Sequence, residues 1–373
     1  MQFEKYPFEK LTELLEKVEP NNEYAPLTLT IGEPQFAAPK FIQDKLCQSS
    51  HLLNKYPKTA GEEELKKAVK DFVKRRFAIE LTNEELVLTF GTREVLFNFP
   101  QYFLFDKESP VMAFTNPFYQ IYEGAAIASR AKIKYLHLTK ENDFKPQIDD
   151  SLKEADLVII NSPNNPTASV MRLDELKEWV EAALEYDFVL LNDECYSEIY
   201  RDVPPASLLE ASKAVGNTQF KNILVVNSIS KRSSAPGLRS GFIAGDSKIL
   251  DGYRRYRTYV GCASPLPLQR AAANAWSDEL HVVENRDRYR KNFKLAHEIL
   301  NVAIPEATFY LWLEVRDDLG FTKELYEKYN VKVLPGSFLG REGAGKGFVR
   351  VALVYDECKT EEALQRIAKL WRE

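Results

Sequence analysis

Six short apolar runs recur along the first two thirds of the chain, and a polar loop follows each of them. Uninterrupted β-branched runs of this length predict buried strands. Apolar residues at helical spacing around 65–73 and 173–186 predict helices between some of the strands. Strands that alternate with helices in this way predict an open α/β sheet. The runs lie at residues 85–90, 111–114, 157–160, 188–191, 223–226 and 242–244.

The two ends of the chain carry weaker patterns of the same kind. Residues 308–313, 331–338 and 347–353 predict strands of a smaller α/β domain. Pro265 and Pro267 suit the first turn of one long helix that reaches about residue 300. Near the start, residues 1–25 have the apolar spacing of a packing helix, and residues 27–31 alternate like a strand.

The loop after residues 223–226 carries the most informative chemistry. Open α/β sheets bind ligands at the carboxyl ends of their strands, and this loop contains Lys231, Arg239, Ser228 and Ser230. An amine can form a Schiff base with an aldehyde, and a guanidinium can fork onto phosphate oxygens. Hydroxyls can donate to the same oxygens. These are the groups needed to hold a phosphorylated aldehyde.

The spacing in that loop, Ser-x-Ser-Lys followed by Gly-x-Arg-x-Gly, resembles the cofactor-lysine signature of fold-type I aminotransferases that depend on pyridoxal 5′-phosphate (PLP). The resemblance implies that Lys231 forms the covalent link to PLP and that Arg239 binds its phosphate, with help from Ser228. It also implies a large doubly wound domain with a mixed sheet, and a smaller α/β domain built from both termini. The expected division is 1–45, 46–265 and 266–373, with the N-terminal arm and part of the small domain in the first segment.

Asp193 and Tyr196 follow the run at 188–191 in a second motif of this family. By resemblance, Asp193 pairs with the pyridine nitrogen of PLP and Tyr196 donates to its phenolic oxygen. The chemistry explains the acid, because only a protonated pyridinium effectively draws away the negative charge that forms on the substrate's α-carbon. Lys231, Asp193 and Tyr196 are therefore the predicted catalytic residues.

Further matches follow three other runs, again at expected strand ends. The turn at 165–168 resembles the family's N-P-T-G turn, with Ala168 in place of glycine, and implies that Asn165 contacts the phenolic oxygen and the substrate. An aromatic at the place of Tyr119 stacks on the cofactor in this family. A Gly-Thr turn opens a helix at residue 92, where unpaired N–H groups suit a phosphate. The resemblance assigns this role to the backbone amides of Thr92 and Arg93.

Three remaining positions concern the substrate and a second subunit. The turn at 31–34 resembles the family's I-G-E-P turn, which brings Gly32 near the substrate carboxylate. Arg350 stands in an apolar run, where a cation is costly unless it meets an anion, and by resemblance it binds the substrate's α-carboxylate. Tyr56 is assigned by resemblance to the phosphate of the neighbouring subunit, which implies a homodimer with shared active sites.

Composition narrows the possible partners. The chain has 373 residues and a formal net charge of −5, which gives no basic field for nucleic acid. A short basic and aromatic run at 253–259 does not change this expectation. No stretch approaches the length of a membrane span. The four cysteines and four histidines have no paired or ligand spacing, so we expect neither a disulfide framework nor a metal site. These features predict a cytoplasmic enzyme.

Five longer blocks of sequence are similar to N-succinyldiaminopimelate aminotransferases of bacterial lysine biosynthesis. They lie at residues 230–246, 256–263, 275–282, 284–289 and 307–313. These enzymes move an amino group between glutamate/2-oxoglutarate and N-succinyl-2-amino-6-oxopimelate. That substrate carries carboxylates far from the reacting carbon, and Arg93, Arg232 and Arg257 are the candidates to bind them. The alternatives are an aspartate or broad-specificity aminotransferase and, less favoured, a PLP-dependent carbon–sulfur lyase. A PLP-binding transcription regulator needs a DNA-binding domain that residues 1–25 are too short to form.

Overall fold

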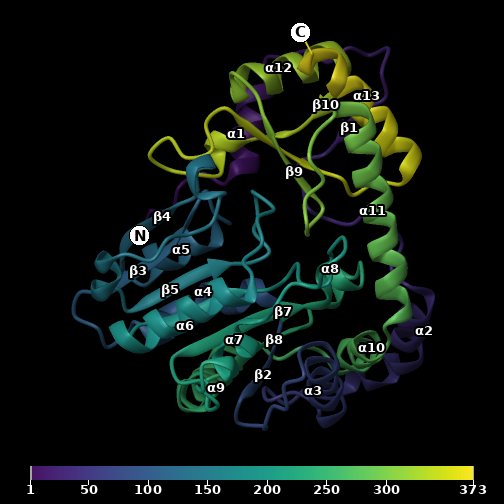
Figure 1. The fold of residues 1–373 in the computed structure, drawn as a ribbon. Helices are drawn as coiled ribbons and strands as arrows, with labels where there is room; N and C mark the ends of the chain where they lie inside the picture. The colour runs from purple at the N-terminus through teal and green to yellow at the C-terminus, as the bar shows by residue number, and fades with distance from the viewer. Residues whose placement is uncertain (1, 373) are drawn as a thin grey trace.

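The computed structural model describes residues 2–372, and a seven-stranded sheet forms its centre (Figure 1). The strand order is β2-β8-β7-β6-β5-β3-β4. The antiparallel β8 pairs with β2 on one side and β7 on the other, and the remaining pairs are parallel. The strands are Leu86–Thr89 (β2), Val111–Asn116 (β3), Lys132–His137 (β4), Leu157–Asn161 (β5), Val189–Asp193 (β6), Ile223–Ser228 (β7) and Gly241–Gly245 (β8).

All six predicted runs are strands of this sheet, and β4 is the strand that the sequence pattern missed. β4 lies at the edge of the sheet, where most of its residues are only partly buried. It therefore lacks the continuous apolar run that marks a strand covered on both faces.

Helices cover both faces of the sheet because successive strand residues point to opposite sides. Along β6, Leu190 packs in one hydrophobic cluster and Val189 and Leu191 pack in the other. The first cluster includes residues of α3, α6, α7 and α10, and the second includes residues of α4, α5 and α9. These helices are Glu63–Phe77 (α3), Thr92–Phe103 (α4), Ile121–Ala128 (α5), Leu173–Tyr186 (α6), Leu208–Ala214 (α7), Ser247–Val260 (α9) and Leu266–Ser277 (α10).

Segments from both ends of the chain form the smaller α/β unit. Its core joins residues of β1, β9, β10, β12, α11, α12 and α13, and β1 from the N-terminal part pairs in parallel with β10. A three-stranded antiparallel sheet has the order β11-β12-β9. The elements are Leu27–Thr28 (β1), Leu280–Leu300 (α11), Tyr310–Glu314 (β9), Asp318–Tyr329 (α12), Val331–Lys332 (β10), Leu334–Pro335 (β11), Phe348–Ala352 (β12) and Glu357–Trp371 (α13).

The predicted single helix from residue 265 to 300 is wrong, because α10 ends at Ser277 and α11 starts at Leu280. Asp278 between them has an extended backbone (φ −98°, ψ 134°), and its carboxylate accepts the His281 N–H at 3.1 Å. This bond from the first turn of α11 to the Asp278 side chain stabilises the break between the two helices. α11 then runs from the large sheet to the smaller unit (Figure 1).

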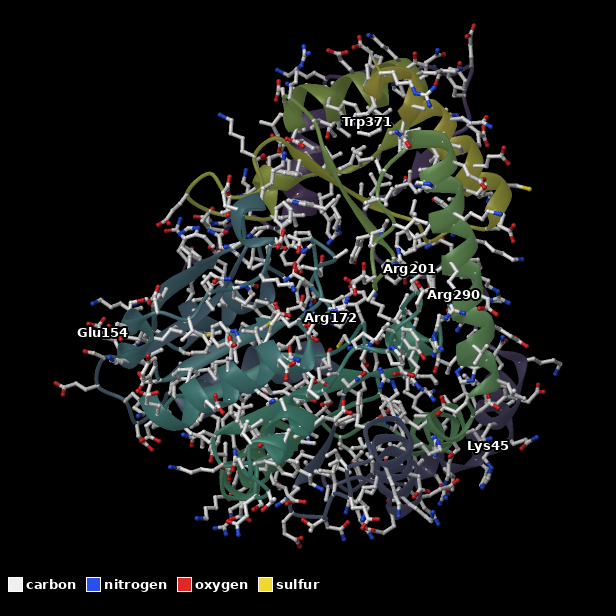
Figure 2. The ribbon with its side chains drawn as sticks, in the orientation of Figure 1. Lys45, Glu154, Arg172, Arg201, Arg290 and Trp371 are labelled. Carbon is white, nitrogen blue, oxygen red and sulfur yellow. The ribbon has the colours of Figure 1, made fainter. Side chains whose placement is uncertain are left out.

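Further hydrogen bonds and ion pairs join the two parts of the molecule. Arg290 on α11 donates from Nε to the carbonyl oxygen of Arg201 at 2.7 Å, and Arg201 donates from Nη1 to Ile304 O at 3.0 Å. Arg172 pairs with Glu306 at 2.5 Å. Figure 2 labels all three arginines: Arg290 lies on α11, Arg201 lies close to it, and Arg172 lies near the middle of the view. These contacts fix the position of the smaller unit over the large sheet.

Several further helices complete the fold of the described residues. Lys40–Ser49 (α2) packs on α10, and α10 in turn packs on α3. The division of the chain at 45 and 265 stays a proposal. Pro7–Leu15 (α1) packs Leu11 and Leu15 against Leu334 and Leu339. Of the helices in residues 2–372, none combines the length and apolar character needed to cross a membrane. The short 3₁₀ helices are Ser50–Asn54, Lys140–Asn142, Asp150–Glu154, Pro236–Leu238 and Gly336–Phe338.

Candidate active site

A cavity of about 490 Å³ lies where the carboxyl ends of β5, β6 and β7 meet the smaller unit. Of the site residues predicted from the sequence, all line this cavity except Tyr56, which is fully exposed, and the distal-carboxylate candidates Arg232 and Arg257. The lining residues among them are Gly32, Thr92, Arg93, Tyr119, Asn165, Asp193, Tyr196, Ser228, Lys231, Arg239 and Arg350. Segments far apart in the sequence therefore meet at one edge of the sheet.

Lys231 lies on the single-turn helix Ile229–Arg232 (α8) directly after β7. Ser228 starts this turn, because its Oγ accepts the N–H of Ser230 at 3.4 Å. The lysine Nζ donates to the carbonyl oxygen of Gly32 and lies 5.6 Å from the centre of the Phe309 ring. Burial lowers the pKa of Lys231 to about 8. A substantial fraction of the amine is therefore neutral near neutral pH, as a nucleophile or a base must be.

Asp193 ends β6 with its carboxylate at the cavity wall. Oδ1 accepts the backbone N–H of Cys195 at 3.2 Å, and Oδ2 accepts the hydroxyl of Tyr122 at 3.0 Å. Burial raises the pKa of this carboxyl group, against the effect of both hydrogen bonds. Among the residues that the structure describes, no cation lies within ion-pair distance of Asp193. A protonated pyridine nitrogen would supply the missing positive partner.

The phosphate end of the cavity combines a helix N-terminus with Arg239. Gly91 precedes α4 with φ +78°, and no side chain caps this helix, so its first N–H groups have no partner within it. Arg239 donates from Nη2 to Phe90 O at 3.2 Å and from Nη1 to Pro236 O at 2.9 Å. A Cβ on Gly91 would overlap this guanidinium. Glycine thus lets the arginine and the helix N-terminus face the same space.

Arg239 lies in the same loop as Lys231, as expected from the sequence. It immediately precedes β8, which is antiparallel to β7. An antiparallel strand starts at the edge where its neighbour ends, and this places Arg239 at the same edge as Lys231.

Arg350 on β12 extends from the smaller unit into the cavity. Its Nη1 donates to Asn165 Oδ1 at 2.6 Å, its Nη2 donates to Thr30 O at 2.6 Å, and its guanidinium lies 4.4 Å from the Tyr310 ring. The buried Nε has no hydrogen-bond partner. A guanidinium held in this way has donors left for a carboxylate. Because Asn165 accepts through Oδ1, its Nδ2 remains as the donor toward the cavity.

The loop that carries Asn165 is held by Asn161, which sequence reasoning missed. Asn161 Nδ2 donates to Asp193 O at 2.7 Å, and its Oδ1 accepts the N–H of Asn165 at 2.7 Å. This side chain therefore ties the end of β5 to the end of β6. Ala168 has a left-handed backbone (φ +62°), so the turn keeps that conformation although alanine replaces glycine.

The sequence analysis also missed four aromatic or sulfur-containing residues that line the cavity or contact a residue that lines it. They are Tyr6, Tyr122, Cys195 and Tyr310. Tyr196 and Tyr310 share a hydrogen bond between hydroxyls at 3.0 Å, and Tyr6 accepts from Arg93 Nη2 at 2.7 Å. Cys195 Sγ lies 3.1 Å from Thr92 Oγ1. These residues lie in segments whose apolar spacing predicts packing. Tyr122 had one usable signal, its position three residues after Tyr119 in the same motif.

Two candidates for distal carboxylate binding are wrong. Arg232 is buried and pairs with Glu279 at 2.6 Å, and Arg257 is buried and pairs with Glu94 at 2.7 Å. Neither residue lines the cavity. Sequence alone could not separate them from Arg93, because the carboxylates that neutralise them are 47 and 163 residues away.

The donor set fits PLP group by group: an amine for the aldehyde, a buried carboxylate for the pyridine nitrogen, and a helix N-terminus with an arginine for the phosphate. Together with the mixed seven-stranded sheet, this site defines a fold-type I PLP-dependent enzyme. Within residues 2–372, no cluster of three or more His, Cys, Asp or Glu side chains is arranged to hold a metal ion.

The chain belongs to the family "Aminotransferase class I and II", whose model matches residues 24–367. It is 51% identical to the solved structure of aminotransferase AspB from Helicobacter pylori, with a TM-score of 0.98 and complete coverage of both chains. An LL-diaminopimelate aminotransferase of Dehalococcoides mccartyi is 30% identical over 361 residues, 92% of this chain and 90% of that protein. An aspartate aminotransferase of Pyrococcus abyssi is 30% identical over 366 residues, 93% and 92% of the two chains. The protein is a PLP-dependent aminotransferase.

Proposed function

We propose that this aminotransferase moves an amino group between glutamate/2-oxoglutarate and N-succinyl-2-amino-6-oxopimelate, in the synthesis of diaminopimelate and lysine. The observation that carries the proposal is the presence in one cavity of two arginines, Arg350 and Arg93, in addition to Arg239 at the phosphate end. The first suits the α-carboxylate of an amino acid, and the second suits a carboxylate farther along the substrate. A relative named for LL-diaminopimelate is consistent with a long dicarboxylic substrate.

Arg93 has the contacts expected of a group that binds a distal carboxylate. One of its five N–H donors goes to the Tyr6 hydroxyl, and its guanidinium lies 5.5 Å from the Tyr6 ring and 6.0 Å from the Tyr119 ring. Phe8, Ile31 and Leu339 line the same cavity. Apolar walls of this kind suit the methylene carbons that separate the two ends of a diaminopimelate skeleton.

The site residues divide the reaction among them as follows. PLP, when bound, supplies the electron sink for the negative charge that develops on the substrate's α-carbon. Lys231 Nζ takes the α-proton and later delivers it, which its pKa of about 8 permits near neutral pH. Arg350 orients the substrate through its carboxylate. Asp193 holds the proton on the pyridine nitrogen, and Tyr196 and Asn165 donate to the phenolic oxygen. Ping-pong kinetics should follow.

Tyr56 enters the proposal through a homodimer. Its side chain is fully exposed, and Leu53 and Tyr259 are also largely exposed. We propose that Tyr56 reaches the phosphate in the partner's active site and that the dimer works in the cytoplasm. Mixing the inactive Lys231→Ala chain with the Tyr56→Phe chain tests this sharing. With sharing, a hybrid dimer contains one site with neither substitution and one with both, so one site should bind PLP with wild-type affinity. If the tighter site of the hybrid only matches the pure Tyr56→Phe protein, the sites are not shared.

A half-reaction tests the substrate. The purified holoenzyme is mixed separately with N-succinyl-L,L-diaminopimelate, glutamate, aspartate and unsubstituted LL-diaminopimelate, and the visible absorbance of the bound cofactor is followed. Fast conversion by the succinylated compound and glutamate supports the proposal. Fast conversion by aspartate, with none by the succinylated compound, would favour the aspartate aminotransferase that another relative's name suggests.

A further inference from the structure

Within the described residues, Tyr122 donates a side-chain hydrogen bond to the Asp193 carboxylate, and the neighbouring Cys195 contacts the same carboxylate through its backbone N–H and its thiol. The hydroxyl lies 3.0 Å from Oδ2, and the whole side chain is buried. An ionised carboxylate can only accept, so the phenol must be the donor. Tyr122 has no part in the mechanism proposed above.

Packing fixes the direction of this hydroxyl. The Tyr122 ring makes edge contacts with Phe114 at 6.0 Å and with Tyr119 at 5.9 Å between ring centres. Tyr122 lies in the first turn of α5, and the preceding Tyr119 lines the cavity. The segment from Tyr119 to Tyr122 therefore places Tyr119 at the cavity and Tyr122 against the Asp193 carboxylate.

We propose that Tyr122 is a positioning residue for Asp193, and that its hydroxyl keeps the carboxylate oriented and ionised for the pyridine nitrogen of PLP. The proposal rests on the role proposed above for Asp193. Tyr122 takes Oδ2 and the Cys195 N–H takes Oδ1, so the carboxylate is held at both oxygens while further lone pairs face the cavity. The titratable groups that face Asp193 are Tyr119, Tyr122, Cys195 and Lys231.

The test measures how pyridoxamine 5′-phosphate binds to apoenzyme at different pH values. This ligand has the pyridine nitrogen of PLP but forms no link to Lys231, so its affinity reports the Asp193 pair without the lysine chemistry. Below the pKa of Asp193, binding must release a proton, and affinity falls as pH decreases. The phosphate of the ligand also titrates at about pH 6, but it does so equally in every variant, so the difference in midpoint between variants reports the ionisation of Asp193 in the apoenzyme.

Tyr122→Phe removes the donor and leaves the ring. The ionised carboxylate then loses stabilisation, so the acid limb should move up by about one pH unit, a tenfold loss of affinity on the acid side. At pH values above the acid limb, Asp193 is ionised in both the wild type and Tyr122→Phe. The carboxylate of Tyr122→Phe is the more basic of the two, so this variant should bind pyridoxamine 5′-phosphate as tightly as the wild type or more tightly. A merely structural defect would weaken binding at every pH.

Tyr253→Phe is the matched control. Tyr253 is also fully buried and belongs to the same hydrophobic cluster, but its hydroxyl donates to the neutral amide of Asn98. Its binding curve should overlie that of the wild type, and thermal unfolding shows that each variant is folded. An unshifted limb in Tyr122→Phe, or an equal loss at all pH values, overturns the proposal. Asp193→Asn should remove the Asp193 part of the limb and leave only the phosphate ionisation at about pH 6, and if its curve matches that of the wild type the role of Asp193 itself is wrong.

Discussion

Arg350 and Asn165 are joined by a hydrogen bond of 2.6 Å between Nη1 and Oδ1. This bond links β12 of the smaller unit to the loop after β5 in the large sheet. A substrate carboxylate bound by Arg350 would therefore lie beside an amide that also faces the phenolic side of the cofactor space. Under the proposed function, recognition of the substrate carboxylate and of the cofactor would depend on one pair of side chains.

Arg350→Lys should lower kcat/KM for the glutamate half-reaction by about a hundredfold, because lysine keeps the charge but cannot form the planar fork. The loss corresponds to about 3 kcal/mol of charge-assisted hydrogen bonding. Single-turnover absorbance measurements give the rate. Arg255→Lys, at an exposed position on α9, is the control and should match the wild type. An unchanged kcat/KM in Arg350→Lys would remove Arg350 from substrate binding.

Lys231 should give the apoenzyme a pH-dependent rate of PLP capture. Burial lowers the pKa of the amine to about 8, and only the neutral amine attacks the aldehyde. The capture rate should therefore rise with pH, pass its half-maximum near pH 8 and level off above it. Rapid-mixing absorbance follows the reaction, and Lys231→Ala should show no such phase. A midpoint near the ordinary lysine value of 10.5 would contradict the buried environment.

The sequence predicted the centre of the sheet well because those strands are covered on both faces and read as continuous apolar runs. It missed β4, which is half-exposed. It also joined α10 to α11, because the break between them involves a hydrogen bond from the His281 N–H to the Asp278 carboxylate, which the sequence does not show. The cavity-lining set was predictable where residues follow strands in recognisable motifs. Asn161 and Tyr310 could not be assigned, because their roles come from contacts across the fold.

Three arginines also show that contacts across the fold could not be predicted from the sequence. Arg93, Arg232 and Arg257 are equivalent in the sequence as cations near the site. The fold pairs two of them with carboxylates and leaves donors of the third facing the cavity. Whether an arginine is paired with a carboxylate depends on the folded structure, and the local sequence around the arginine does not predict it.

Gly91→Ala should weaken PLP binding by roughly tenfold to a hundredfold. The added Cβ would overlap the Arg239 guanidinium, and alanine at φ +78° is strained by about 1–2 kcal/mol. Gly216→Ala separates the two effects, since Gly216 has φ +84° but open space around its Cβ position. Both variants should lose similar stability in thermal unfolding, and only Gly91→Ala should lose cofactor affinity in equilibrium titration. Equal PLP affinities would show that the overlap is relieved without moving Arg239.

Arg257→Met should destabilise the fold without changing substrate recognition. Arg257 donates to both carboxylate oxygens of Glu94, at 2.7 and 3.0 Å, and both side chains are largely buried. Removing the cation leaves a buried carboxylate unpaired, which costs about 3–5 kcal/mol. The apparent KM for the succinylated substrate should stay unchanged, because Arg257 does not line the cavity.

A double variant distinguishes loss of the ion pair from loss of packing. Glu94→Gln in the Arg257→Met background removes the uncompensated charge, so it should recover part of the lost stability in urea unfolding. Glu94 also accepts the backbone N–H of Phe90 at 2.7 Å beside the start of α4, and glutamine can keep that hydrogen bond through its carbonyl oxygen. If the double variant were no more stable than Arg257→Met, the arginine would act through its packed stem and its bond to the Cys262 carbonyl. The ion pair with Glu94 would then contribute little to the stability of this helix start.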